Sequence, residues 1–334
     1  MGTYTPTRPE LRELVDDGIR TYLERRRAEA PDSEVLVAEI ERVVASGGKR
    51  LRPAFCYWGY RASGSGHDDR IIRAAITFEL LHTFAIIHDD IMDSSAERRG
   101  QPTSFARLGL DGALLVGDLA LVFADAALLS AGFGTEVVAA AYGSYSRMQQ
   151  EVIAGQYLDV TAPNDIDPER ARRIAHLKSG SYSIEGPLVV GAQLAGSGDE
   201  LVATLRRVGV AAGEAFQLRD DLLGMFGDPA VTGKSTDADI SDGKRNFLFA
   251  TTAARATGPD RDRFRDGWGA DRLTVEETAW LRALVESSGA RAEAEGLIRD
   301  LERTAADELR SADIPEDARA ALGDLIAAAV DRVA

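Results

Sequence analysis

The sequence predicts an all-α fold built as one large domain. The composition is 45% hydrophobic but only 7% aromatic and rich in alanine and leucine, a balance that favours helices over sheets. No long run of alternating β-branched residues predicts a strand. Residues 71–92 are apolar on nearly every face and contain no glycine or proline, the pattern of a helix buried inside a helical protein.

Helical patterns then account for most of the chain. Residues 9–28 and 32–46 are amphipathic, and the second segment ends at Gly47 and Gly48, a strong stop signal. Beyond the central stretch, helices are expected at 112–130, 135–158, 169–177, 183–195 and 199–226, then a polar loop at 227–244. Four more helices are expected after residue 246, with loops near 257–272, 288–290 and 311–315. Because no change of composition marks a boundary, we expect one domain spanning residues 1–334.

The charge and the cysteine content restrict the partners and the compartment. A formal net charge of −15 argues against nucleic acid as a partner and favours a soluble protein. Cys56 is the only cysteine, which favours a reducing, cytoplasmic location, and the N-terminus lacks an apolar signal core. The most membrane-like run, residues 112–134, carries Asp118 and Asp125 near its middle, so we expect a bundle helix and no transmembrane segment.

Three carboxylates stand at the end of the central apolar stretch. Asp93 follows Asp89 by four residues and Asp90 by three, so the three side chains can gather within one helical turn. Such a cluster repels itself unless a cation sits among the side chains, and oxygen ligands suit Mg²⁺. Arg98 and Arg99, two planar cations suited to phosphate, follow directly.

A second aspartate pair strengthens this interpretation. An isolated acidic cluster is usually a solvated surface. Residues 214–228, however, repeat the pattern, with Asp220 and Asp221 ending an apolar helix and Gln217 three residues before the first of them. Two such helices could face each other across a cavity and hold metal ions between them.

Cations stand at breaks of the chain and suit a substrate that carries diphosphate. They are Lys49, Arg52, Arg98, Arg99, Lys178, Lys234 and Lys244. Metal ions held by carboxylates make diphosphate a better leaving group, while cations take up the charge that develops. The apolar helix that bears the first aspartates implies that the rest of the substrate is hydrophobic.

The motifs together resemble those of the trans-type polyprenyl diphosphate synthases, in particular short-chain geranylgeranyl diphosphate synthases. They are GGKRLRP at 47–53, HDDIMDSSAERRG at 88–100, GQYLD at 155–159, Lys178-Ser179, FQLRDD at 216–221 and GDPAVTGK at 227–234. The resemblance implies a helical bundle around a central cavity, of the isoprenoid synthase type, and a homodimer. It also implies three Mg²⁺ ions, and a condensation of isopentenyl diphosphate with an allylic diphosphate by ionisation, attack of the double bond and proton loss.

The resemblance also assigns roles to residues. Asp89, Asp90 and Asp93, with Asp220 and Asp221, would hold the metal ions. Arg98, Lys178, Gln217, Lys234 and Lys244 would face the allylic diphosphate and the nascent cation, although the loop spacing before Lys244 is unusual. Lys49, Arg52, His82 and Arg99 would hold isopentenyl diphosphate. Gly224 departs from the pattern, since many members have a third aspartate there.

Two neighbouring residues bear on product length. On an ideal helix Ala85 lies directly beneath Asp89, whereas Phe84 is rotated by about 140°. Geometry therefore makes Ala85 the pocket wall. In the family, a bulky residue at position 84 beside a small one resembles synthases that stop at geranylgeranyl diphosphate. Phe84 as ordinary core packing stays an equal alternative. Geranylgeranyl diphosphate is the expected product, and a farnesyl or longer product is the alternative.

Three other functions would also use part of these motifs. His88-Asp89 fits the metal dyad of HD-type phosphohydrolases, but only His67 and His82 precede it where that fold needs more histidines. A terpene cyclase would not need the residues that match the isopentenyl diphosphate site. A non-catalytic synthase subunit would not need two intact aspartate pairs, although Gly224 keeps it open.

Overall fold

The computed structural model describes residues 4–227, 238–270 and 273–330. Within these ranges every regular element is a helix except one short β-hairpin, which confirms the all-α prediction. The chain divides into two compact units. The first comprises residues 1–147, 186–206 and 312–325, and the second comprises residues 148–185, 207–311 and 326–334. One domain spanning residues 1–334 stays a prediction.

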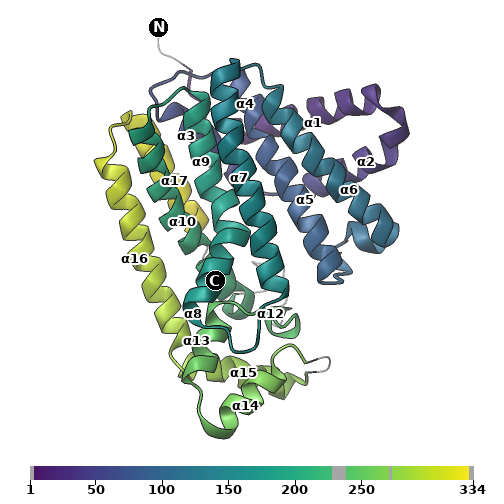
Figure 1. The fold of residues 1–334 in the computed structure, drawn as a ribbon, viewed down its shortest axis with the longest axis vertical. Helices are drawn as coiled ribbons and strands as arrows, with labels where there is room; N and C mark the ends of the chain where they lie inside the picture. The colour runs from purple at the N-terminus through teal and green to yellow at the C-terminus, as the bar shows by residue number, and fades with distance from the viewer. Residues whose placement is uncertain (1–3, 228–237, 271–272, 331–334) are drawn as a thin grey trace. The chain divides into compact units, whose positions relative to one another are not determined.

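The first unit contains the central apolar stretch. Its complete elements are α1 (Arg8–Glu29), the 3₁₀ turn η1 (Pro31–Ser33), α2 (Glu34–Ala45), α3 (Leu51–Arg61), α4 (Asp69–Ala75), α5 (Thr77–Met92), β1 (Glu97–Arg98), β2 (Gln101–Pro102), α6 (Ser104–Leu129) and α9 (Gly186–Leu194) (Figure 1). Three helices contribute residues to both units: α7 (Thr135–Val160), α10 (Asp199–Phe226) and α17 (Glu316–Val330). The hairpin had no signal in the sequence, because each strand has only two residues.

Helix α5 packs along α6 (Figure 1). Phe78, Leu80 and Leu81 of α5 are fully buried, as its apolar sequence predicts. The predicted start of α6 was wrong, because the helix begins at Ser104 and is kinked at Gly109, where φ is 70°. The α5 helix therefore lies in the core of this unit and carries the first aspartates at its C-terminal end.

Helices α3 and α9 approach each other at two glycines. A Cβ atom on Gly59 would lie 2.4 Å from the carbonyl oxygen of Leu188, and one on Gly191 would lie 2.0 Å from that of Cys56. Both contacts are with backbone atoms, which cannot rotate away. The two helices can therefore pack this closely only without side chains at these positions.

We expect Gly191→Ala to lower the free energy of unfolding by about 3 kcal/mol, the upper end of the usual cost of overpacking. Gly143→Ala in α7 is the matched control, since a Cβ atom there meets nothing within 4 Å. The control should be neutral or stabilise by up to about 1 kcal/mol through helix propensity. Urea denaturation of both variants measures the difference, and equal stabilities would contradict the close α3–α9 contact.

The second unit contains the remaining helices. They are α8 (Pro168–Ala175), the π-helix η2 (His176–Glu185), α12 (Ala238–Ser241), α13 (Phe247–Arg255), α14 (Gly258–Gly267), α15 (Val275–Ser287) and α16 (Ala290–Ser311). The interruption expected at 178–182 is the π-helix, which keeps the chain helical with a wider turn.

The loop predicted at 257–272 was wrong, because α14 lies within it. Helix α14 is polar and exposed apart from Phe264, so it shows no amphipathic stripe in the sequence. Pro259 stands in its first turn, where proline suits a helix. Phe264 stacks on Phe249 at a centroid distance of 5.5 Å and also contacts Trp268, and this aromatic packing anchors the helix.

Two helical stretches are long and apolar enough to cross a membrane by length and composition alone, residues 69–92 and 104–129. The most apolar window of the first is 72% buried within the protein, the pattern of a core helix, whereas that of the second is only 44% buried. The second stretch is α6, whose apolar residues are therefore partly exposed.

Candidate active site

The first aspartates lie where α5 ends. Asp90 is buried, Asp89 is half-buried, and Asp93 is exposed and caps the helix. Arg98 reaches both inner carboxylates, its Nε 2.7 Å from Asp90 Oδ1 and its Nη2 3.2 Å from Asp89 Oδ2. Burial raises the pKa of Asp90, and the Arg98 charge opposes that shift. The structure thus brings Arg98, predicted from the sequence as a cation for phosphate, into contact with both inner aspartates.

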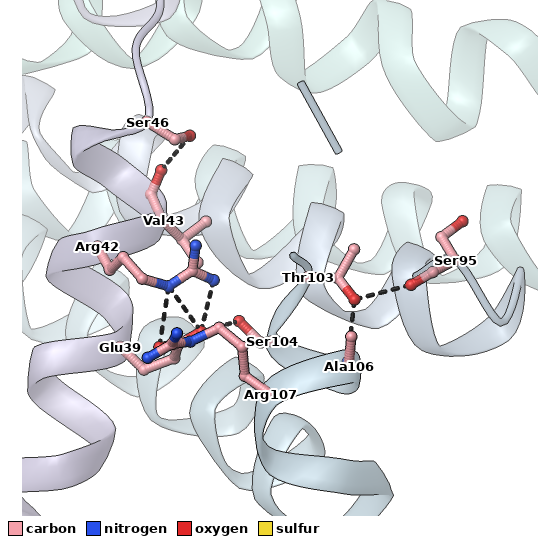
Figure 2. A network of polar contacts seen from close by, with 9 residues as sticks. All are labelled: Glu39, Arg42, Val43, Ser46, Ser95, Thr103, Ser104, Ala106 and Arg107. Carbon is pink, nitrogen blue, oxygen red and sulfur yellow. Dashed lines mark hydrogen bonds and ion pairs between the residues drawn. The ribbon is translucent and has the colours of Figure 1, made fainter. Parts of the chain in front are cut away.

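The segment after α5 is fixed by short polar contacts. The backbone N–H of Ser95 donates to the carbonyl oxygen of Asp90 at 2.9 Å. Thr103 Oγ1 donates to the carbonyl oxygen of Ser95 at 2.7 Å and accepts from the N–H of Ala106 at 3.1 Å, as Figure 2 shows. These bonds tie the segment to the start of α6, and the hairpin within it returns Arg98 to the aspartates.

A buried carboxylate holds α2 against the same end of α6 (Figure 2). Glu39, 4% exposed, accepts from Arg42 at 2.5 Å, from Ser104 Oγ at 2.8 Å and from Arg107 Nε at 3.2 Å. Burial alone would raise its pKa, but the hydrogen bonds from Arg42 and Ser104 hold the pKa of Glu39 below its usual value. The network fixes α2 directly before the basic loop at residues 46–50.

The cations of residues 49–52 differ in burial: Arg50 is buried, whereas Lys49 and Arg52 are more exposed. Arg50, only 8% exposed and with φ of 49°, bonds Glu79 and Asp16, each at 2.7 Å. Lys49 is exposed and Arg52 is half-buried. Lys49 of the loop and Arg52 in the first turn of α3, the two predicted site residues of this segment, are thus more exposed than Arg50.

The basic loop and the hairpin meet. Arg99, which has a left-handed φ of 53°, donates from Nη1 to the carbonyl oxygen of Gly47 at 2.7 Å. Burial and the neighbouring charge of Arg98 lower the pKa of Arg99. A positive φ is rare for a non-glycine residue. Arg99 adopts this unusual backbone conformation while its side chain bonds the basic loop.

His82 lies on α5 within reach of the charges from both segments. Burial and the charges of Arg52, Arg99, Arg98 and Arg50 hold its pKa well below the ordinary value, so the imidazole is neutral at pH 7. The predicted residues Arg52, His82, Arg98 and Arg99 are therefore brought together in the first unit. A neutral donor among guanidinium groups suits a diphosphate, which supplies the missing negative charge.

Phe84 belongs to the contact between α5 and α6. It is buried, and its ring meets that of His88 edge to face at a centroid distance of 4.7 Å. His88 itself lies over Gly117 of α6, where a Cβ atom would come within 2.3 Å of the imidazole. Ala85 is half-buried. The pocket-wall and core-packing alternatives for Phe84 both stay open.

In the second unit Lys178 lies on the π-helix and contacts Asp159. Its Nζ is 2.6 Å from Asp159 Oδ2. A Cβ atom on Gly155 would lie 2.4 Å from the backbone nitrogen of Lys178, so the glycine lets α7 and η2 approach this closely. The GQYLD motif thus supplies both the glycine at the contact and the carboxylate partner of the lysine.

The second aspartate pair ends in a buried carboxylate. Gln217 Nε2 donates to Asp221 Oδ1 at 2.9 Å, whereas Asp221 Oδ2 has no hydrogen-bond partner within the described ranges. Burial and the charge of Asp239 raise the pKa of Asp221 well above its usual value. Asp220 is half-buried. Lys244 Nζ lies 3.3 Å from Asp239 Oδ1, which places the predicted Lys244 beside this motif.

Asp239 was missed by the sequence analysis. It lies in the polar loop among several other aspartates, and its distance along the chain from Asp221 gives no periodic signal. Gly224 was the feature of the sequence that pointed to a close contact here, because a glycine inside a helix leaves room for another group. Lys234 lies outside the described residues.

The carboxylates fit Mg²⁺ as partial ligand sets. Among residues 4–227, 238–270 and 273–330, no group of three or more histidine, cysteine, aspartate or glutamate side chains is arranged to hold a metal ion alone. Mg²⁺ characteristically takes one or two protein carboxylates and completes its octahedron with water and phosphate oxygens. The unpartnered Asp221 Oδ2 is consistent with such a site.

Comparisons with known proteins identify the relatives of this chain. A family model described as polyprenyl synthetase matches residues 33–285. A geranylfarnesyl diphosphate synthase from Aeropyrum pernix is 36% identical over 64% of this chain and 69% of its own length. A (2E,6E)-farnesyl diphosphate synthase from Mycobacterium bovis is 32% identical over 86% of this chain and 80% of its own length.

A solved structure matches nearly the whole chain. The geranylgeranyl pyrophosphate synthase of Corynebacterium glutamicum, complexed with isoprenyl diphosphate and magnesium, has a TM-score of 0.90 and 34% identity. The alignment covers 96% of this chain and 98% of that one. The predicted fold class is therefore confirmed.

Proposed function

Because the chain belongs to the polyprenyl synthetase family of prenyltransferases, we propose that it is a short-chain trans-prenyl diphosphate synthase. It joins isopentenyl diphosphate to allylic diphosphates and makes chiefly geranylgeranyl diphosphate. The observation that carries the proposal is the cluster of Arg52, Arg98 and Arg99 around a neutral His82, next to Asp89 and Asp90. His82, Asp89 and Asp90 lie on α5, and Arg98 contacts both aspartates. Anion-binding groups therefore lie next to carboxylates that can bind metal, as a diphosphate substrate requires.

The residues divide between two substrates. Lys49, Arg52, His82 and Arg99 hold the diphosphate of isopentenyl diphosphate, and the neutral imidazole donates one hydrogen bond while the cations balance its charge. Arg98, Lys178, Gln217, Lys234 and Lys244 face the allylic diphosphate and the positive carbon. Asp89, Asp90, Asp93, Asp220 and Asp221 would hold Mg²⁺, three ions by the family resemblance, and the ions would neutralise the charge of the leaving diphosphate.

The reaction needs no covalent intermediate with the protein. The allylic C–O bond breaks, and the electron pair leaves with the diphosphate. The double bond of isopentenyl diphosphate then attacks the allylic cation, and the proton lost from the new cation passes to the departed diphosphate. The protein orients the two substrates and excludes water, which would otherwise capture the cation.

Incubation of the purified protein with Mg²⁺ and labelled isopentenyl diphosphate tests the proposal. Dimethylallyl, geranyl and farnesyl diphosphate are offered separately as primers, and the products are separated by chain length. Geranylgeranyl diphosphate as the chief product from all three primers supports the proposal. Farnesyl diphosphate as the end product would overturn the chain length, and no condensation with any primer would overturn the function.

Phe84 is proposed to set the chain length, and we expect Phe84→Ala to shift the products beyond geranylgeranyl diphosphate. The opposite variant, Ala85→Phe, is expected to shorten the products because Ala85 lies beneath Asp89. Product chromatography measures both. An unchanged product with a loss of about 3–5 kcal/mol in unfolding free energy would instead show that Phe84 is core packing.

We also propose that the protein is a cytoplasmic homodimer. The support is an apolar stripe on α6: Leu115, Val122 and Leu129 are spaced by seven residues and are 54%, 60% and 52% exposed. Seven residues are close to two helical turns, so the three side chains lie on one face. Exposed apolar patches of this kind mark interaction sites.

Val122→Asp is expected to convert the dimer into a monomer at micromolar concentration, because it would bury a charge at a self-complementary contact. Analytical ultracentrifugation measures the mass. Val275→Asp is the control, since Val275 is 82% exposed on α15 and outside the stripe. A wild-type monomer, or a Val122→Asp variant that stays dimeric, would contradict the proposed interface.

A further inference from the structure

One buried carboxylate joins α2 to the start of α6. Glu39 lies on α2 and is 4% exposed. From α6, Ser104 Oγ donates to Glu39 Oε1 at 2.8 Å and Arg107 Nε donates to Oε2 at 3.2 Å, as Figure 2 shows. Arg42, on the next turn of α2, bonds both oxygens and balances their charge. Hydrogen bonds to a charged group are roughly twice as strong as neutral ones, so this contact firmly links the two helices.

The link fixes the position of α2 in a way that apolar packing does not. Val37 and Ile40 of the same helix are fully buried. Hydrophobic burial stabilises the helix but has no preferred direction. The Glu39 carboxylate, in contrast, must meet two donors on another helix at short distance and with good alignment. Glu39 therefore sets where α2 lies relative to α6, and not only how strongly it is held.

Both helices adjoin segments that carry the predicted diphosphate-binding cations. Helix α2 leads into the basic loop at residues 46–50, and α6 follows the hairpin that carries Arg99. Thr103, the residue before Ser104, donates to the carbonyl oxygen of Ser95 at 2.7 Å and so ties the hairpin segment to α6. A shift of α2 against α6 would therefore move the basic loop against the hairpin.

The two arginines of the hairpin depend on this placement to different extents. Arg98 bonds Asp89 and Asp90, which lie on α5, so its position does not require α2. Arg99 donates to the carbonyl oxygen of Gly47 at 2.7 Å, which is a contact between the hairpin and the basic loop. A shift of α2 would lengthen the Arg99 contact and leave the Arg98 contacts in place.

We propose that Glu39 is a positioning residue for the isopentenyl diphosphate site. It acts through the spacing of α2 and α6, which brings Arg99 to the basic loop that carries Lys49. The inference rests on the proposed function, which assigns these two cations to isopentenyl diphosphate. Donors that are held in place before the substrate arrives make its binding cost less. Loss of the Glu39 charge should therefore weaken the binding of isopentenyl diphosphate and spare the allylic site.

The test is Glu39→Gln, which keeps the size of the side chain and removes its charge. We expect the KM for isopentenyl diphosphate to rise by about 10-fold, the scale of weakening one hydrogen bond to a charged group, with kcat and the KM for geranyl diphosphate within about twofold of the wild type. An unchanged KM for isopentenyl diphosphate would overturn the proposal. An equal rise in both KM values would also overturn it, because it would indicate a general disturbance.

Ile40→Val is the matched control for lost stability, because it removes a methyl group from a fully buried side chain of the same helix. It should lower the melting temperature without changing either KM. A rise in the KM for isopentenyl diphosphate as large as that of Glu39→Gln would show that any weakening of α2 has this effect, and would overturn the specific role of Glu39.

Ser104→Ala changes the other side of the link. It removes one donor to Glu39, so we expect the KM for isopentenyl diphosphate to rise by about threefold. The double variant Glu39→Gln/Ser104→Ala should be no worse than Glu39→Gln alone, because both changes break the same contact. Effects that multiply would overturn the coupling. If Glu39→Gln does not fold, Ser104→Ala decides, and an unchanged KM for that variant overturns the inference.

Binding without turnover separates this inference from the proposed function. Isopentenyl diphosphate is titrated by calorimetry into the full-length wild type and into Glu39→Gln, with no primer present. We expect a Kd about 10-fold higher for the variant. A wild type that binds no isopentenyl diphosphate would contradict the proposed function. A wild type that binds it, with a variant that binds it equally tightly, would overturn the role of Glu39 alone.

Discussion

The Asp89→Asn variant is expected to lose about 10²–10³-fold in kcat for the condensation of isopentenyl diphosphate with geranyl diphosphate, the scale of losing one charge-stabilising group. The substitution keeps the size of the side chain but removes a charge that would hold Mg²⁺. Its fold should survive, because Arg98 keeps its 2.7 Å contact with Asp90. Steady-state assays with labelled isopentenyl diphosphate measure the loss.

Asp111→Asn on α6 is the matched control for this loss. Asp111 is exposed, so the same chemical change should leave kcat within about twofold of the wild type. Asp93→Asn should fall between the two, since Asp93 is exposed at the helix end and belongs to the same motif. If Asp89→Asn retained more than a tenth of the activity, α5 would not carry the first metal site.

The second prediction concerns Asp221, where activity and stability should move in opposite directions. Asp221→Asn should lower kcat by about 10²–10³-fold. It should also raise the unfolding free energy of the metal-free protein by about 1–3 kcal/mol, the cost of a buried unsatisfied polar group. The reason is that Asp221 is buried beside Asp239 with one oxygen unpartnered, whereas an amide there could donate to Asp239.

The pH dependence gives this prediction a second readout. Because the pKa of Asp221 is raised above 3.8 in the folded state, the folded protein binds its proton more tightly than the unfolded chain does. Stability from this group is therefore present at low pH and is lost as the pH rises through the folded pKa. Asp221→Asn should remove this fall in stability with rising pH, because the asparagine side chain does not ionise. Urea denaturation of the wild type and the variant without Mg²⁺, from acid pH to pH 7, measures how the free energy of unfolding changes with pH. A variant that is less stable than the wild type at pH 7 would contradict the account.

Sequence periodicity predicted α5 well because burial on all sides leaves an unbroken apolar pattern. The sequence showed Arg98 as a nearby cation for phosphate, and only the structure shows that the hairpin brings it into contact with Asp89 and Asp90. Lys49 and Arg52 were named as cations at a break of the chain, and their roles came from the family resemblance. Only the structure shows why the remaining cation, Arg50, is different: its two salt bridges bury it.

The features that sequence alone missed depend on contacts across long stretches of chain. Asp239 meets Gly224 through space, and no helical or strand period links the two positions. Helix α14 buries only Phe264, which is too little to make an amphipathic pattern. The π-helix that carries Lys178 is visible in the sequence only as an interruption, and its close contact with Gly155 of α7 joins positions that are more than twenty residues apart.

The most direct test of the central claim is the Mg²⁺-dependent incorporation of labelled isopentenyl diphosphate into a longer allylic diphosphate by the purified wild-type protein. We predict incorporation with geranyl diphosphate as the primer when Mg²⁺ is present, and its loss when the metal is removed with a chelator and its return when Mg²⁺ is restored. Incorporation that persists without divalent metal, or a folded protein that incorporates no label with Mg²⁺, would contradict the proposed metal-dependent transfer of a prenyl group to isopentenyl diphosphate.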